Sequence, residues 1–289
     1  MKRLIILFLS ILFLLCGCTS APAATDIAAT TLPVWEFTSR LCDGTGLTVS
    51  RLITENVSCL HDYSLNVRQV QAVEQADLVV ISGAGLEEFM EDLLSNKATI
   101  DASSGISLLE SCHDHDHADA HHHHEEDAHI WLDPQNAAAM TKNIHAGLCA
   151  QYPQHRAIFD QNLQTLLAEI AELEVYGIQQ LENLSHRELI TFHDGFSYLA
   201  HAYDLSILEA IEEESGAEAS AAELIELISL VQEHRLPAIF VEVNGSTSAA
   251  QIISAETGKP VYSLDMAMGG ESWFAAMYHN IDSLKEALQ

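Results

Sequence analysis

The sequence predicts an α/β protein of two parallel-sheet lobes joined by one long rigid helix, with a ligand cleft between the lobes. Short β-branched runs alternate with helical segments from residue 27 to residue 102, which is typical of a parallel sheet covered by helices. The same alternation returns between residues 188 and 288. Between the two series, apolar residues recur at helical spacing from residue 153 to 184, and a helix of about 30 residues would span roughly 45 Å.

The first series contains four expected strands, at residues 27–32, 47–53, 77–82 and 99–102. Helices are expected at residues 33–42, 65–75 and 86–94, and another from about 133 to 150. Asp133 suits the N-cap of this last helix and Pro134 its first turn, so we interpret both as structural residues. The N-terminal lobe is therefore expected over residues 26–152, followed by the linking helix at 153–185.

The second series predicts a C-terminal lobe over residues 186–289. Its strands are expected at residues 188–192, 206–211, 238–243 and 260–264. Ser220 and Glu223 have the spacing of a capping box and open a helix that runs to about residue 234. A further helix at residues 246–257 ends at Gly258, and an amphipathic helix at 272–288 closes the chain.

The chain is strongly acidic, with 42 Asp and Glu against 12 Lys and Arg and a formal net charge of −30 over 289 residues. It has no basic stripe to neutralise phosphates, which argues against nucleic acid as a partner. An acidic exterior instead gathers cations.

The first 17 residues read as a signal peptide. Lys2 and Arg3 precede an apolar run at residues 4–15 that is too short for a stable membrane span. The run ends in Leu-Cys-Gly-Cys, which resembles the lipobox of bacterial lipoproteins. This resemblance implies cleavage before Cys18, a lipid anchor on its thiol, and a tether at residues 18–25.

Four further cysteines could form two disulfides outside the cytoplasm, with three possible pairings. They are Cys42, Cys59, Cys112 and Cys149. The sequence does not choose among the pairings. Cys59 and Cys112 lie beside histidines, so either could instead be a metal ligand.

Residues 113–127 concentrate imidazoles and carboxylates, which are ligands for borderline divalent metals. The histidines of this segment are His113, His115, His117, His121, His122, His123 and His124. The segment has almost no apolar surface, so we expect an auxiliary loop that binds metal weakly and without fixed geometry. A tight site requires ligands held by folded elements.

Four residues are the candidates for that tight site. His193 and Asp265 directly follow expected strands, and ligands of parallel sheets bind beyond the carboxyl ends of strands. His61 and His129 lie in non-periodic segments of the first lobe. Three imidazoles and one carboxylate suit zinc better than calcium or magnesium. We interpret the other folded-region histidines as surface or capping residues: His145, His155, His186, His201, His234 and His279.

Several segments together resemble the zinc-type solute-binding lipoproteins of metal ABC importers (the zinc/manganese-binding cluster A-I family). They are CLHDY at 59–63, ADLVV at 76–80, GAGLE at 83–87, HIWLDP at 129–134, FHDGF at 192–196 and VYSLD at 261–265. The resemblance implies metal held between two lobes by His61, His129, His193 and Asp265. Manganese-type members have Glu at the third position, so His193 indicates zinc. The chain departs from the family pattern around His61, where Cys59-Leu60 and Ser64-Leu65 replace the usual residues.

The resemblance implies that this chain is not an enzyme. We expect it to capture zinc outside the cytoplasm as a monomeric, membrane-anchored lipoprotein and to deliver it to an ABC permease. Manganese or iron as cargo, and a zinc-storage or adhesin lipoprotein, are the alternatives. A zinc hydrolase is a further one, for which we would nominate Asp194, next to His193, as the general base, but the sequence has no HExxH motif.

Overall fold

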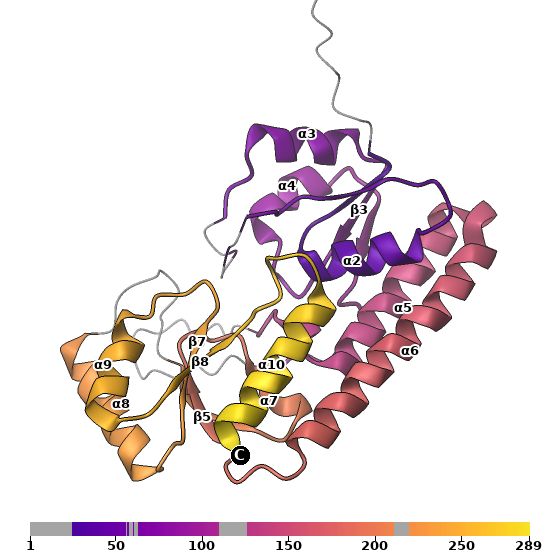
Figure 1. Cartoon of the computed structure of the whole chain (residues 1–289). Coiled ribbons are helices and arrows are strands. Elements are labelled where there is room, and N and C mark those ends of the chain that lie inside the picture. Colours follow the sequence, from indigo (N-terminus) through magenta and orange to yellow (C-terminus); the bar gives the residue numbers. More distant parts are fainter. Residues whose placement is uncertain (1–24, 56, 58–59, 61–62, 110–125, 211–219) are drawn as a thin grey trace, which may run out of the picture.

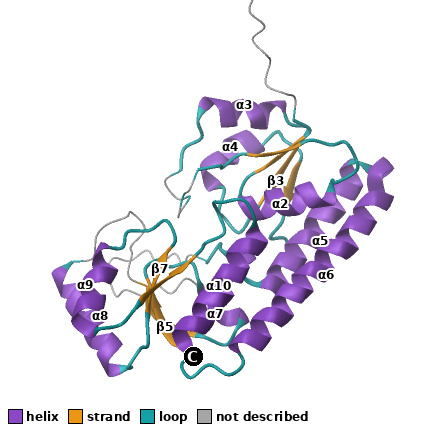
Figure 2. Ribbon diagram, viewed as in Figure 1, coloured by secondary structure: helices purple, strands orange, loops and turns teal. Residues whose placement is uncertain are grey.

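The computed structural model describes residues 25–55, 57, 60, 63–109, 126–210 and 220–289. It contains two four-stranded parallel sheets, with strand orders β2-β1-β3-β4 and β6-β5-β7-β8 (Figure 1). The strands of each sheet lie between helices (Figure 2). The predicted α/β class with two parallel sheets is confirmed.

The first sheet is built from β1 (Ile27–Ala29), β2 (Val49–Arg51), β3 (Leu78–Ile81) and β4 (Thr99–Asp101), all paired in parallel. Helix α2 (Leu32–Leu41) packs on β1, β2 and β3, and α5 (Pro134–Gln151) packs on β4. The other helical segments of this half are α3 (Val67–Gln75), η1 (Glu88–Met90), α4 (Glu91–Leu94) and η2 (Ile130–Leu132).

The linking helix α6 (Arg156–Leu181) has 26 residues and packs against α5, α2 and α10 (Trp273–Leu288), so it touches both halves (Figure 1). It is shorter than the helix of about 30 residues that the sequence predicts. The reason lies at its start, where Pro153–His155 form the separate 3-10 turn η3.

The second sheet consists of β5 (Glu188–Thr191), β6 (Ser206–Ala210), β7 (Ile239–Glu242) and β8 (Val261–Leu264). Helices α8 (Ala221–Glu233) and α9 (Ser248–Thr257) pack together, and α9 lies on β7 and β8. The sequence did not predict α7 (Ser197–Ala202), which has six residues and no side-chain cap. Such a short segment is too brief to show helical periodicity.

The predicted helix ends have their expected chemistry. Asp133 caps α5 by accepting a hydrogen bond from the Gln135 N–H at 2.7 Å. Ser220 and Glu223 form both bonds of the capping box at the start of α8. Gly258 ends α9 in the left-handed conformation with φ of 71°, which glycine adopts without steric cost.

One apolar core runs through both halves of the molecule. Trp131, Trp273, Phe37 and Met266 all belong to it. The Trp131 indole N–H donates to the carbonyl of Met266 at 2.8 Å, and the Trp273 indole N–H donates to the carbonyl of Trp131 at 3.0 Å. Because these bonds are buried, they fix the segment after Trp131 against the segment after β8.

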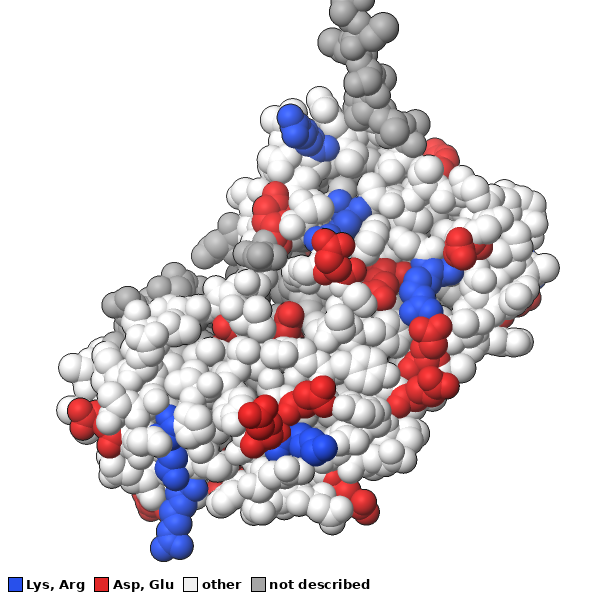
Figure 3. All heavy atoms as spheres, viewed as in Figure 1, with Lys and Arg blue, Asp and Glu red and all other residues white. Residues whose placement is uncertain are grey.

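Acidic and basic side chains are interspersed on the face shown in Figure 3, with no continuous basic stripe. Within the part of the chain that the structure describes, no helix is both long enough and apolar enough to cross a bilayer.

Two of the four cysteines lie in the described residues, and both are buried free thiols: Cys42 and Cys149. In each of the three possible pairings, all four cysteines are bonded, so neither Cys42 nor Cys149 would be free. The two-disulfide arrangement, one of the possibilities that the sequence left open, is therefore not the one in this structure. Cys59 and Cys112 lie outside the described residues.

Glu87 is a buried carboxyl group at the carboxyl ends of β1 and β3. It accepts hydrogen bonds from Thr30 Oγ1 at 2.6 Å, the Ser82 N–H at 2.7 Å and the Gly83 N–H at 3.0 Å. Burial nevertheless raises the pKa of Glu87 from 4.5 to about 7, since desolvation of the charged form outweighs these bonds. The contribution of the protonated Glu87 side chain to the free energy of unfolding is therefore complete below pH 4.5. It is lost as the pH rises through about 7.

Glu87→Gln is therefore expected to be less costly at pH 7.5 than at pH 4.5. Glutamine resembles the neutral acid at every pH, so the difference in unfolding free energy between the natural protein and the variant should shrink by about 3 kcal/mol over this range. Urea denaturation at both pH values measures it. Glu88→Gln, at the exposed neighbour, is the matched control. A difference that stays constant with pH would contradict the raised pKa.

Candidate metal centre

Nine of the predicted metal and anchor residues lie outside the described residues. They are Cys18, His61 and the seven histidines of the auxiliary loop, His113, His115, His117, His121, His122, His123 and His124. His129, His193 and Asp265 are described. His193 and Asp265 follow predicted strands, whereas His129 precedes the 3-10 turn η2, which the sequence did not predict.

His129 lies directly before η2, and its side chain is almost fully buried. The Asp127 carboxylate accepts a hydrogen bond from the His129 backbone N–H at 2.8 Å, and the same oxygen lies 2.8 Å from His129 Nδ1. The neutral tautomer that donates from Nδ1 to Asp127 leaves Nε2 with its lone pair. A histidine held in this way through one nitrogen is oriented to bind a metal through the other.

His193 follows β5 and approaches His129 from the second half. The two ring centroids lie 5.8 Å apart, with an interplanar angle of 84°. The Thr191 hydroxyl donates to the His193 carbonyl at 3.0 Å, which fixes the turn, and His193 Nε2 is shielded from solvent. The structure therefore brings together two imidazoles that are 64 positions apart in the sequence.

Gly195 allows the close approach of the two halves at this point. A Cβ atom built there would lie 2.4 Å from Met266 Cε and 3.0 Å from both Nδ1 and Cε1 of His129. Any side chain at position 195 would therefore displace the His129 ring or the Met266 side chain. The sequence signal for this contact is only a glycine after His193-Asp194.

Asp265 follows β8 and is held by its backbone. Its N–H donates to Asn280 Oδ1 at 2.6 Å, and Asn280 Nδ2 donates back to its carbonyl at 2.8 Å. The carboxylate accepts from the Ala267 N–H at 2.8 Å, and Ala267 has a positive φ of 56°. This turn anchors the segment that ends at Met266, whose carbonyl binds Trp131.

His129, His193 and Asp265 do not form a complete ligand group in this structure. His129, His193 and Asp265 do not offer three ligand atoms that all lie within 4.8 Å of one another. Within the described residues, the group that meets this criterion is His145, Cys149 and Asp160. The four-ligand site that includes His61 therefore stays a prediction.

The two ends of the histidine-rich segment are fastened beside these histidines. The Asp127 N–H donates to the Leu109 carbonyl at 2.9 Å. From α7, the Tyr198 hydroxyl donates to the Asp127 carbonyl at 3.0 Å and accepts from the Leu109 N–H at 2.9 Å. Burial raises the pKa of Tyr198 to about 12, so the hydroxyl keeps its proton at neutral pH. Sequence reasoning missed Tyr198, and it counted Asp127 among the loop acids.

The chain matches a family model described as the periplasmic zinc-uptake complex component A over residues 27–287. It is 30% identical to the zinc-binding lipoprotein AdcA of Streptococcus pneumoniae R6 over 99% of this chain and 61% of AdcA. It is 27% identical to the high-affinity zinc uptake system protein ZnuA of Bacillus subtilis over 94% of this chain and 92% of that protein.

The fold agrees with these matches. A crystal structure of ZnuA superimposes with a TM-score of 0.80 at 29% identity, covering 92% of this chain and 100% of that chain. The chain spans 61% of the length of AdcA, which is therefore the longer protein. The family model covers nearly all of the described residues, from the start of β1 to the last turn of α10. The chain therefore belongs to the zinc-uptake complex component A family.

Proposed function

We propose that this chain captures zinc outside the cytoplasm and delivers it to an ABC-type metal importer. The family consists of substrate-binding components rather than enzymes, so no catalytic step is involved. The observation that carries the proposal is the pair of histidines that meet where the two halves join, one of them oriented by a buried carboxylate. Two such imidazoles favour zinc over manganese as cargo, because manganese prefers oxygen ligands.

The ligand set of the proposed site is His61, His129, His193 and Asp265. Residues 26–152 and 186–289 act as the two lobes, and α6 connects them. Since His129, His193 and Asp265 do not form a complete ligand group in this structure, metal capture draws these side chains closer together.

The proposal extends to the loop and to the anchor. Residues 113–127 collect zinc weakly, and their attachment at Leu109, Asp127 and Tyr198 supports transfer to the nearby histidines. Cys18 carries the lipid that holds a monomeric protein at the membrane. AdcA, a relative at 30% identity, is named a lipoprotein, which supports this anchor.

Gly195→Ala tests the proposed site without removing a ligand. The added methyl would force the His129 ring or Met266 to shift, so the affinity of the first zinc equivalent is expected to fall about 10-fold. Competition with a chromophoric chelator measures this affinity. Gly177→Ala is the matched control, because its methyl would meet the Tyr203 side chain instead of a site residue.

An unchanged affinity in Gly195→Ala would contradict a site at His129. A protein that takes up many zinc ions with no tight first equivalent would instead favour zinc storage. Manganese binding tighter than zinc binding in the same titration would make manganese the cargo.

A further inference from the structure

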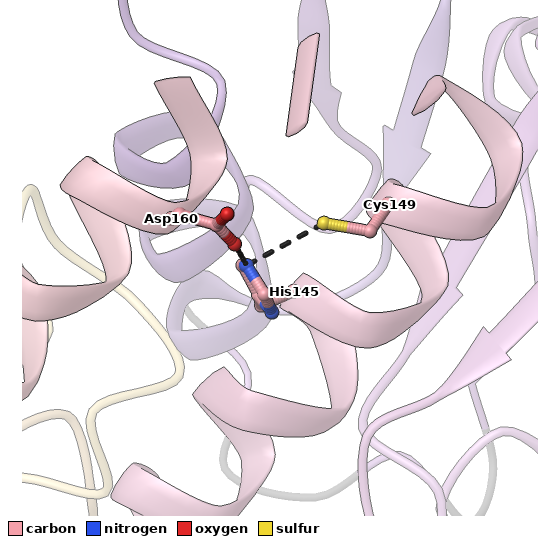
Figure 4. Close-up of side chains that lie close together, drawn as sticks. All are labelled: His145, Cys149 and Asp160. Atoms are coloured by element: carbon pink, nitrogen blue, oxygen red, sulfur yellow. Dashed lines mark hydrogen bonds and ion pairs between the residues drawn. The ribbon is translucent and has the colours of Figure 1, made fainter. Parts of the chain in front are cut away.

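A second group of metal-ligating side chains lies on the paired helices α5 and α6. It consists of His145 and Cys149 on α5 and Asp160 on α6 (Figure 4). One ligand atom from each residue lies within 4.8 Å of the others. The sequence pattern did not reveal the group, because its third member joins only when α6 folds back along α5.

The geometry is close to that of a tetrahedral zinc site. Cys149 Sγ lies 3.4 Å from His145 Nε2, and zinc bonds to sulfur and nitrogen would place these atoms about 3.5 Å apart. His145 Nε2 lies 2.8 Å from Asp160 Oδ1, so the carboxylate would need to move by roughly 0.5 Å to admit an ion. The spacing of His145 and Cys149 is i, i+4, which places both side chains on one face of the helix.

Two of the three side chains are shielded from solvent, and the third is open to it. Cys149 is 3% exposed and the His145 side chain 15%, whereas the Asp160 side chain is 50% exposed. An ion could enter past Asp160, and water could supply a fourth ligand from the same side. The site lies on two long helices, and ligands on helices are held more precisely than ligands on loops.

Burial and two neighbouring charges change the pKa of the Cys149 thiol, in opposite directions. Burial is the main cause that raises the pKa of Cys149, Arg156 opposes it, and Asp160 raises it further. The thiol is therefore protonated before an ion binds. Formation of the metal–sulfur bond breaks the S–H bond and releases one proton to the solvent, as with other thiolate metal sites.

We propose that His145, Cys149 and Asp160 form a second binding site for zinc, separate from the proposed zinc site at His129 and His193. The nitrogen, sulfur and oxygen set suits zinc and its analogue cobalt, whereas manganese disfavours a thiolate ligand. An ion at this position links α5 to α6 and so fastens the linking helix to the first half of the molecule.

Cobalt titration of the intact protein tests the proposal, because only a cysteine ligand gives the near-ultraviolet thiolate-to-cobalt absorption band. This band is expected in the natural protein and in His129→Ala. It should be absent in Cys149→Ser and retained in Cys42→Ser, which alters the other buried free thiol. Asp160→Asn, at a half-exposed position, should weaken cobalt binding at this site about 10-fold without loss of helix content.

Absence of the thiolate band in the natural protein would overturn the second site. So would a band that persists in Cys149→Ser, since the thiol would then belong to another cysteine. As a second readout, bound zinc should slow alkylation of Cys149 and leave alkylation of Cys42 unchanged. Loss of tight binding in His129→Ala while the band remains would separate this site from the proposed transport site.

Discussion

His129→Ala is expected to lower the affinity of the first zinc equivalent by more than about 100-fold, because it removes a buried, pre-oriented ligand rather than a supporting group. The ring is held between Asp127 and Gly195, and it faces His193 across the junction of the two halves. Competition titration with a chromophoric chelator measures the loss.

His186→Ala is the matched control for this substitution. His186 lies close to the start of β5, and its backbone N–H donates to the Leu288 carbonyl at 3.1 Å. Zinc affinity should be unchanged in this variant. Equal losses in both variants would indicate general destabilisation and would contradict a ligand role for His129.

Removal of residues 113–125 is expected to leave the tight site intact and to remove only the weak zinc equivalents. The direct backbone bond between Leu109 and Asp127 brings the two ends together, so a short connection spans the gap. The deletion must end before Asp127, because that carboxylate orients His129. Loss of the tight site in this shortened protein, together with its retention in His129→Ala, would favour zinc storage in the loop.

Asp127→Asn is expected to weaken zinc binding by about 10- to 100-fold with little change in the unfolding temperature. Such losses are typical when the group that orients a metal-binding histidine is removed. The amide keeps the size of the carboxylate but loses the charged acceptor that holds the Nδ1 proton and so orients the imidazole. Zinc titration and thermal unfolding of the same samples separate a positioning role from a structural one.

Asp101→Asn provides the matched control for Asp127→Asn. Asp101 also accepts from the backbone N–H two residues later, at 2.8 Å from Ser103, but its side-chain partner is the Ser103 hydroxyl rather than an imidazole. Its replacement should leave zinc affinity unchanged. If Asp127→Asn lowers the unfolding temperature and leaves zinc affinity intact, Asp127 supports only the turn before His129.

The sequence by itself determined the elements of this protein. Alternating strand and helix periodicities predicted both parallel sheets, and local chemistry predicted helix ends at Asp133, Ser220 and Gly258. These features depend on residues within a few positions of one another, so the signal is present in any short window. The position of His193 and Asp265 after strands follows from the same local reasoning.

Only the tertiary structure decided which side chains meet. Asp127, a loop acid in the sequence, orients His129; Tyr198, on a helix too short to predict, fastens the ends of the loop. The sequence led us to interpret His145 as a surface or capping residue. In the fold, α6 packs back along α5 and places Asp160 beside both His145 and Cys149. Such contacts join residues that no periodicity relates, because their distance is set by how helices and sheets pack and not by the sequence between them.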